Sequence, residues 1–174
     1  MNLKATLGGR IGISDIRAIC AHCSGSCETE LLSYAFDSDD RTAYNALWAL
    51  THFPRKGRDL LLPYRDRLID SLLATAHVGR RRLMLSLLDA LPCEAADIRT
   101  DYLDFCLDRI NSTEPYGVRA LCLRQAYAQC RHYPELIHEL RQQMQIMALA
   151  PLSPGLRSVL RHISRLLPPA SPSL

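Results

Sequence analysis

The chain has 174 residues and a net charge of +3 at pH 7, with 48% hydrophobic and 22% charged side chains. This composition suffices for one folded domain of ordinary size, and so small a net charge does not by itself indicate a nucleic-acid-binding protein. The sequence lacks a secretory leader pattern and any uncharged run of about 18 apolar residues, so we expect a cytoplasmic protein without a membrane partner. Only eight Gly, three Phe and one Trp are present, which favours helices over a sheet.

The amino-terminal part predicts a lead-in followed by a loosely patterned helix pair. Residues 1–13 contain a Gly-Gly pair and are expected to be irregular. Apolar residues at helical spacing then predict one helix over residues 14–23 and a second over 27–36, which together form a repeat over about residues 14–39. The pattern is looser here because a terminal repeat lacks a neighbour on one face.

Three further helix pairs follow at regular intervals. Proline ends two of the first helices, at Pro54 and Pro92, because it cannot donate the next backbone hydrogen bond. The predicted first helices cover residues 41–53, 80–91 and 115–131, and the second helices cover residues 63–76, 101–111 and 134–149. These pairs define repeats over about residues 40–77, 78–114 and 115–152.

A last helix, over residues 153–167, is expected to cap the final repeat. Ser153 is a typical amino-terminal cap, and Pro154 suits the first helical position because its missing N–H is not needed there. The tail that follows, residues 168–174, has too little apolar material to pack and is expected to be mobile.

A self-similarity of about 38 residues links these segments. Arg81, Arg119 and Arg157 are separated by successive steps of 38 residues. A fixed period of this length is typical of helical repeat proteins, in which each repeat buries its apolar face against its neighbours. We therefore expect the repeats to form a single domain over residues 1–174.

The segment from Phe36 to Leu50 resembles the first helix of a HEAT repeat, in which an acidic turn and an arginine precede small and large apolar residues. Residues 118–121 and 156–159 resemble the same signature, which armadillo repeats share in part. The resemblance implies an all-α fold, a right-handed α-α superhelix (HEAT-like solenoid) of about four helix pairs. It also implies a scaffold that holds proteins or peptides, although some such proteins bind nucleic acid.

Carboxylates recur in register on the predicted second helices. Asp66 and Asp70 return 38 residues later as Asp104 and Asp108, and Glu28 lies 38 residues before Asp66. Residues four apart share one helix face, and stacked second helices align such positions. We interpret these five residues, the acidic strip, as a candidate site for a basic protein or peptide segment. The alternative is that the carboxylates only stabilise helix amino ends.

The basic residues concentrate towards the carboxyl end of the chain. Arg157, Arg161 and Arg165 are four residues apart and share one face of the last helix, opposite its apolar side. Two interpretations of this basic face stay open. It is either the solvated outer face of a capping helix or a site for an acidic or phosphate-bearing partner.

One stretch of the sequence suggests a metal site, because it holds Cys20, His22, Cys23 and Cys27. Cys20 and Cys23, however, continue the apolar stripe of their predicted helix, so both are expected in the core. No second Cys or His pair follows at the distance typical of a zinc finger. We therefore expect reduced, buried thiols, no metal and no cofactor.

No catalytic motif is present in the sequence. The enzymes that the architecture most resembles are the HEAT-like alkylpurine DNA glycosylases, which combine a basic concave surface with a carboxylate and aromatic neighbours. Trp48 is the candidate aromatic residue, but the acidic strip would face the DNA phosphates, and we expect Trp48 to pack between two repeats. The sequence therefore predicts a non-enzymatic scaffold that binds protein or peptide segments through its second helices. A DNA-binding protein related to those glycosylases is the alternative.

Overall fold

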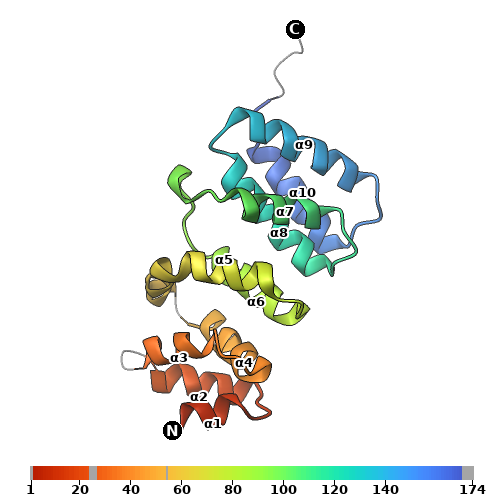
Figure 1. The fold of residues 1–174 in the computed structure, drawn as a ribbon. Coiled ribbons are helices and arrows are strands. Elements are labelled where there is room, and N and C mark those ends of the chain that lie inside the picture. Colours follow the sequence, from red (N-terminus) through yellow and green to blue (C-terminus); the bar gives the residue numbers. More distant parts are fainter. Residues whose placement is uncertain (1, 24–26, 54, 170–174) are drawn as a thin grey trace. The chain divides into compact units, whose positions relative to one another are not determined.

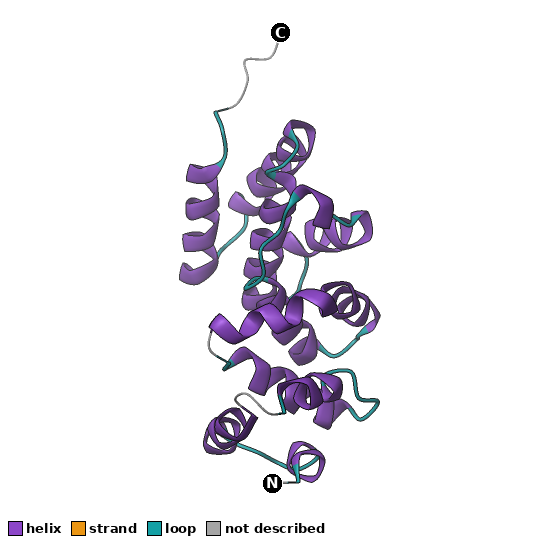
Figure 2. Cartoon of the chain, turned by 90° about the vertical axis from the view of Figure 1, so that its left-hand side faces the viewer, coloured by secondary structure: helices purple, strands orange, loops and turns teal. Residues whose placement is uncertain are grey.

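The computed structural model describes residues 2–23, 27–53 and 55–169. In this part of the chain all regular structure is helical, and no strand is present (Figure 2). The predicted all-α class is confirmed, and consecutive helices pack in neighbouring pairs. The chain divides into two compact units, Met1–Leu91 and Pro92–Leu174, each described here by itself. One domain over residues 1–174 stays a prediction, and most of the tail expected to be mobile lies outside the described residues.

The first unit is organised around one central helix. α4 contacts α1, α2, α3 and α6, while α5 packs against α6. The helices of this unit are α1 (Leu3–Leu7), α2 (Ile13–Cys23), α3 (Glu28–Tyr34), α4 (Asp40–Thr51), the 3-10 helix η1 (Arg55–Tyr64), α5 (Arg65–Ala74) and α6 (Val78–Leu88) (Figure 1).

The amino-terminal lead-in contains the short helix α1. The sequence-based prediction that this segment is irregular is therefore wrong. Asn2 caps this helix by accepting a hydrogen bond from the Ala5 amide at 3.1 Å. Leu3 and Leu7 are buried at its two ends, 4% and 0% exposed. Five residues give too short a pattern for periodicity to reveal, which is why the sequence did not predict the helix.

The central helix α4 shows why these segments are helical. Asp39 caps it by accepting a hydrogen bond from the Thr42 amide at 2.8 Å. One side of the helix is fully buried through Ala43, Ala46 and Leu47. The bounds predicted for this helix and for the other helices from residue 14 onward differ from those in the structure by a few residues at most.

The second unit is also organised around one central helix, α8, which is the first helix of its pair. α8 contacts α7, α9 and α10, and α7 also contacts α9. As predicted, Ser153 caps α10 by accepting a hydrogen bond from the Leu156 amide at 3.3 Å, and Pro154 occupies the first turn. The helices are the 3-10 helix η2 (Ala95–Asp97), α7 (Thr100–Ile110), α8 (Tyr116–Cys130), α9 (Pro134–Ala148) and α10 (Pro154–Leu166) (Figure 1).

The arginines that reveal the 38-residue period share one structural task. Arg81 donates from Nη2 to the Thr75 carbonyl at 3.0 Å, directly after α5. Arg119 donates from Nε to the carbonyl of Ile110, the last residue of α7, at 2.9 Å. In the third copy, the Nη2 atom of Arg157 donates to a carbonyl in the loop after α9. Each arginine therefore ties a first helix to the end of the helix or loop before it.

Candidate functional site

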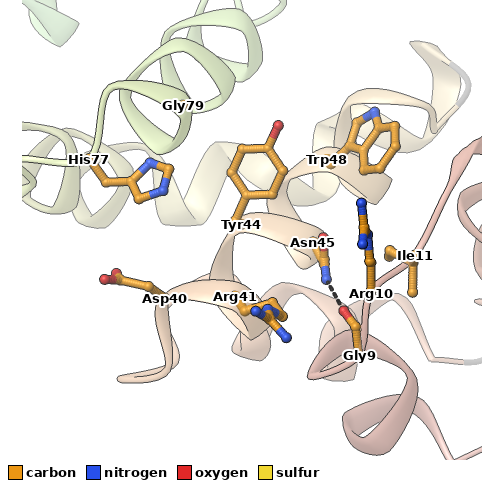
Figure 3. A pocket seen from close by; sticks show the side chains of 10 residues that line it. All are labelled: Gly9, Arg10, Ile11, Asp40, Arg41, Tyr44, Asn45, Trp48, His77 and Gly79. Atoms are coloured by element: carbon orange, nitrogen blue, oxygen red, sulfur yellow. Dashed lines mark hydrogen bonds between the residues drawn. The ribbon is translucent and has the colours of Figure 1, made fainter.

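A pocket of the first unit lies beside α4 and has a volume of about 840 Å³. We call it the Trp48 pocket. Its walls come from the loop after α1, one face of α4 and the start of α6 (Figure 3). The lining residues are Gly9, Arg10, Ile11, Asp40, Arg41, Tyr44, Asn45, Trp48, His77 and Gly79.

One stripe of α4 supplies the main wall of the pocket. Arg41, Tyr44, Asn45 and Trp48 lie three or four residues apart, so they share a single helix face. The rings of Tyr44 and Trp48 have centroids 6.5 Å apart and are tilted by 51°. Both rings are half-buried, so each keeps a surface that a ligand can contact.

The start of α6 completes the aromatic wall. The His77 ring lies 5.8 Å from the Tyr44 ring, and its Nδ1 atom accepts a hydrogen bond from the Arg80 amide at 3.2 Å. This bond caps the amino end of α6 and fixes the orientation of the His77 ring. A Cβ atom at Gly79 would stand 2.8 Å from Cε2 of Tyr44, so the glycine makes room for the tyrosine ring.

A buried amide fixes the loop on the other side of the pocket. Asn45 donates from Nδ2 to the Leu7 carbonyl at 2.7 Å and to the Gly9 carbonyl at 3.1 Å. These bonds satisfy the end of α1 and hold the following residue, Arg10, beside α4. Figure 3 shows the Arg10 side chain extending towards Trp48.

Among the described residues, the acidic group of the pocket is paired, whereas two of its basic groups are not. Asp40 accepts a hydrogen bond from Nη1 of Arg80 at 2.6 Å, so the pocket's carboxylate is already neutralised. Arg10 and Arg41 are exposed, and neither makes an ion pair with any residue in the described part of the chain. The pocket therefore combines aromatic surfaces with two guanidinium groups that form no ion pair with any described residue.

The structure places the five residues of the predicted acidic strip on three helices. Asp66 and Asp70 are exposed on α5, opposite its buried apolar residues, and Asp104 and Asp108 are exposed in the same way on α7. Each pair shares one helix face. Glu28 is only half-exposed, at the start of α3.

Two neighbouring arginines, Arg67 and Arg109, make contacts away from these carboxylates. Arg67 lies over the Phe36 ring, with its guanidinium carbon 4.1 Å from the ring centroid. Arg109 lies 4.7 Å from the Phe105 centroid and forms an ion pair with Glu114 at 3.4 Å. Asp104 and Asp108 form no ion pair with any residue in the described part of the chain.

The basic face lies on α10 as the sequence predicts. Arg157, Arg161 and Arg165 are exposed, while Leu156, Leu160 and Ile163 pack inward on the opposite side. Arg157 donates one hydrogen bond from Nη2 to the Leu152 carbonyl of its own unit, at 3.2 Å. This arrangement fits both open interpretations of the basic face.

The cysteines at the end of α2 are only partly in the core. Cys23 is fully buried, and burial raises its pKa to about 12. Cys20 is half-buried and donates from Sγ to the Ala49 carbonyl at 3.4 Å, so the prediction that it is a core residue is only partly correct. His22 is exposed. Over residues 2–23, 27–53 and 55–169, no cluster of three His, Cys, Asp or Glu side chains is arranged to hold a metal ion.

Sequence reasoning missed the Trp48 pocket. The sequence predicts Trp48 between two repeats but indicates no pocket, and the structure places this half-buried ring in a pocket wall, edge-on to His52 with ring centroids 6.2 Å apart. The signal was present in the stripe of Arg41, Tyr44 and Trp48 along one predicted helix. That stripe does not predict that Arg10 and the start of α6 line the pocket, because only tertiary packing brings these segments beside α4.

Comparison with known families explains the paired helices and the 38-residue period. A HEAT repeat domain model matches residues 3–167, which is nearly the whole chain. The chain belongs to the HEAT repeat family. HEAT repeats generally mediate protein interactions. No curated protein and no solved structure matches the chain. None of the helices described is both long enough and apolar enough to span a membrane.

Proposed function

We propose that this HEAT repeat protein is a non-enzymatic scaffold that binds a basic protein or peptide segment through the acidic strip on its second helices. Family membership supports the general role, because HEAT repeats serve protein interaction. The observation that carries the finer proposal is the pair Asp104 and Asp108. Both carboxylates are exposed on one face of α7, and the described part of the chain offers them no ion-pair partner.

Stabilisation of helix ends does not account for the whole strip. Asp66 lies in the first turn of α5, where the helix dipole favours a carboxylate. Asp70, Asp104 and Asp108 lie beyond the first turn of their helices, where this effect has largely faded. Exposed like charges on one face raise the local negative potential and speed association with a basic partner.

The proposal is tested by charge reversal in the full-length protein. A displayed library of random peptides is selected on the protein, and we expect the enriched sequences to be rich in Lys and Arg. The double variant Asp104→Lys and Asp108→Lys should then bind the best peptide at least about tenfold more weakly, mainly through slower association, and the difference should shrink with added salt.

The matched control is Asp59→Lys, which reverses an exposed carboxylate on η1 that is not part of the acidic strip. This variant should bind the peptide as the original protein does. Equal binding by all variants would contradict the proposal. So would loss of binding only when Arg157, Arg161 and Arg165 are replaced by Gln, because the basic face would then be the working surface.

A further inference from the structure

We infer that the Trp48 pocket is a second binding site, which takes a protein segment that presents a carboxylate beside an aromatic side chain. The site uses first helices and a loop rather than second helices, and its charge is opposite to that of the acidic strip. It therefore extends the proposed scaffold function but rests on residues that the acidic strip does not share.

The size and shape of the pocket suit two adjacent side chains. A volume of about 840 Å³ lies in the range typical of specific ligand pockets. The partly exposed rings of Tyr44 and Trp48 offer aromatic surface, and aromatic pairs prefer tilted or offset contacts of the kind these rings already make with each other. An incoming Phe or Tyr ring can extend this row.

The charges of the pocket select an anion. Because Arg80 neutralises Asp40, the remaining charged groups are the guanidinium groups of Arg10 and Arg41. A planar guanidinium binds a carboxylate with two parallel hydrogen bonds, which gives both energy and orientation. A single carboxylate next to an aromatic ring matches this combination.

The pocket is held in shape before any ligand arrives. Asn45 anchors the loop that carries Arg10 through two buried hydrogen bonds. On the other side, His77 caps α6, and Gly79 leaves the space that the Tyr44 ring occupies. Preorganised walls reduce the entropy lost on binding, as expected for a site and not for an accidental gap between helices.

A nucleic acid fits the same pocket less well. A strand needs a continuous track of cations along successive phosphates. Here the pocket holds only two arginines that form no ion pair with a described residue, Arg10 and Arg41, and the exposed carboxylate of Asp39 lies two residues before Arg41 in the sequence. Two guanidinium groups do not form a phosphate track, whereas a single carboxylate needs only one of them.

The chain has a built-in reporter for this site, because its only tryptophan is Trp48. The probes are acetylated and amidated hexapeptides of Gly and Ser that contain Phe-Glu or Tyr-Asp at the centre, with no tryptophan of their own. Titration into the full-length protein should change Trp48 fluorescence in a saturable way. The matched peptide with Gln in place of Glu should bind about tenfold more weakly, because it loses the charge-assisted hydrogen bonds.

Three variants test the individual walls. Arg10→Gln and Arg41→Gln should each weaken binding of the Phe-Glu peptide by about tenfold and bring it close to that of the Gln peptide. Gly79→Ala should also weaken it, because the added methyl group displaces Tyr44. The control is Arg82→Gln, which removes an exposed arginine of α6 outside the pocket and should leave binding unchanged.

Three results would overturn the inference. One is a lack of saturable Trp48 response to every peptide of the set, with circular dichroism showing folded protein. Another is equal binding of the Glu and Gln peptides. The third is tighter binding of an oligothymidylate that is lost in Arg10→Gln, because the occupant would then be nucleic acid. The acidic-strip variant Asp104→Lys, Asp108→Lys should retain the peptide response, so failure of this inference is distinct from failure of the scaffold proposal.

Discussion

Arg119 donates from its buried guanidinium Nε to the backbone carbonyl of Ile110 at 2.9 Å, and this bond closes the end of α7. The same register position in the next copy, Arg157, makes a similar bond to the Leu152 carbonyl, but in an exposed setting. The 38-residue period thus records a recurring arginine–carbonyl hydrogen bond, and the two copies differ in donor atom, in the position of the carbonyl and in burial.

This difference gives a stability prediction with an internal control. Arg119→Met should lower the free energy of unfolding by about 1 to 3 kcal/mol, because a buried carbonyl loses its charged donor. Arg157→Met should cost less than about 0.5 kcal/mol, because water replaces the lost donor. Urea unfolding followed by circular dichroism measures both values. Equal losses in the two variants would show that burial does not set the strength of this bond.

Asn45 provides a second prediction, for the first unit. Asn45→Asp keeps the shape of the side chain but removes both donors to Leu7 and Gly9, so the unit should lose about 2 to 3 kcal/mol. The loss should appear as an earlier urea transition in Trp48 fluorescence and as faster amide exchange in residues 3–11.

The matched control for that variant is Asn111→Asp. Asn111 also donates twice, to the Gln143 carbonyl and to Oε1 of Gln143, but in an exposed setting in the second unit. It should cost less than about 0.5 kcal/mol. A Trp48 transition unaffected by Asn45→Asp would mean that the loop carrying Arg10 is not held by this amide.

The different burial of the cysteines predicts that they react with iodoacetamide at different rates. Burial raises the pKa of Cys130 to about 12, with a smaller contribution from Glu139. At pH 8 this group is therefore a protonated thiol, and only the thiolate reacts. Iodoacetamide should label the half-buried Cys27 at least about tenfold faster than Cys130 in native protein. Mass spectrometry of timed samples gives both rates.

The pH dependence of that labelling has a definite sign. Raising the pH from 8 to 9 should speed the labelling of Cys130 by about tenfold, because the pH stays well below its raised pKa and the thiolate fraction rises in proportion. Labelling of Cys130 as fast as that of Cys27 at pH 8 would contradict the burial described for α8.

Metal content is a further prediction. With Cys20 bonded to a backbone carbonyl and His22 exposed, we expect purified protein to hold no stoichiometric zinc or iron. Its melting temperature should stay the same in a chelator. Metal in a fresh preparation that is lost together with stability on chelation would assign Cys20, Cys23 and Cys27 to a metal site.

Helical periodicity predicted most of the fold because each long helix carries an apolar stripe and many have a cap or a proline at an end. The structure confirms Ser153 and Pro154 at the start of α10 in this way. α1 was missed because its five residues are stabilised by burial of Leu3 and Leu7 and by the amide of Asn45, which lies 38 residues from Leu7. Such long-range contacts leave no local pattern.

The candidate site was predicted less completely than the fold. The 38-residue spacing identified the acidic strip, since Asp66 and Asp104 occupy equivalent positions of a repeat. The Trp48 pocket depends on Arg10, Trp48 and Gly79, which come from three separate elements and are of three different residue types. A period reveals residue types that recur, whereas Arg10 and Trp48 stand one 38-residue step apart with different side chains.

The most direct test of the scaffold proposal is a map of the bound surface. The full-length protein, labelled with nitrogen-15, is titrated with the best Lys- or Arg-rich peptide from the selection, and amide chemical shifts are followed. The account predicts that the largest shifts lie on α5 and α7, around Asp66, Asp70, Asp104 and Asp108, and that they shrink as salt is added. Shifts confined to α10 around Arg157, Arg161 and Arg165, or spread evenly over both units, would contradict it.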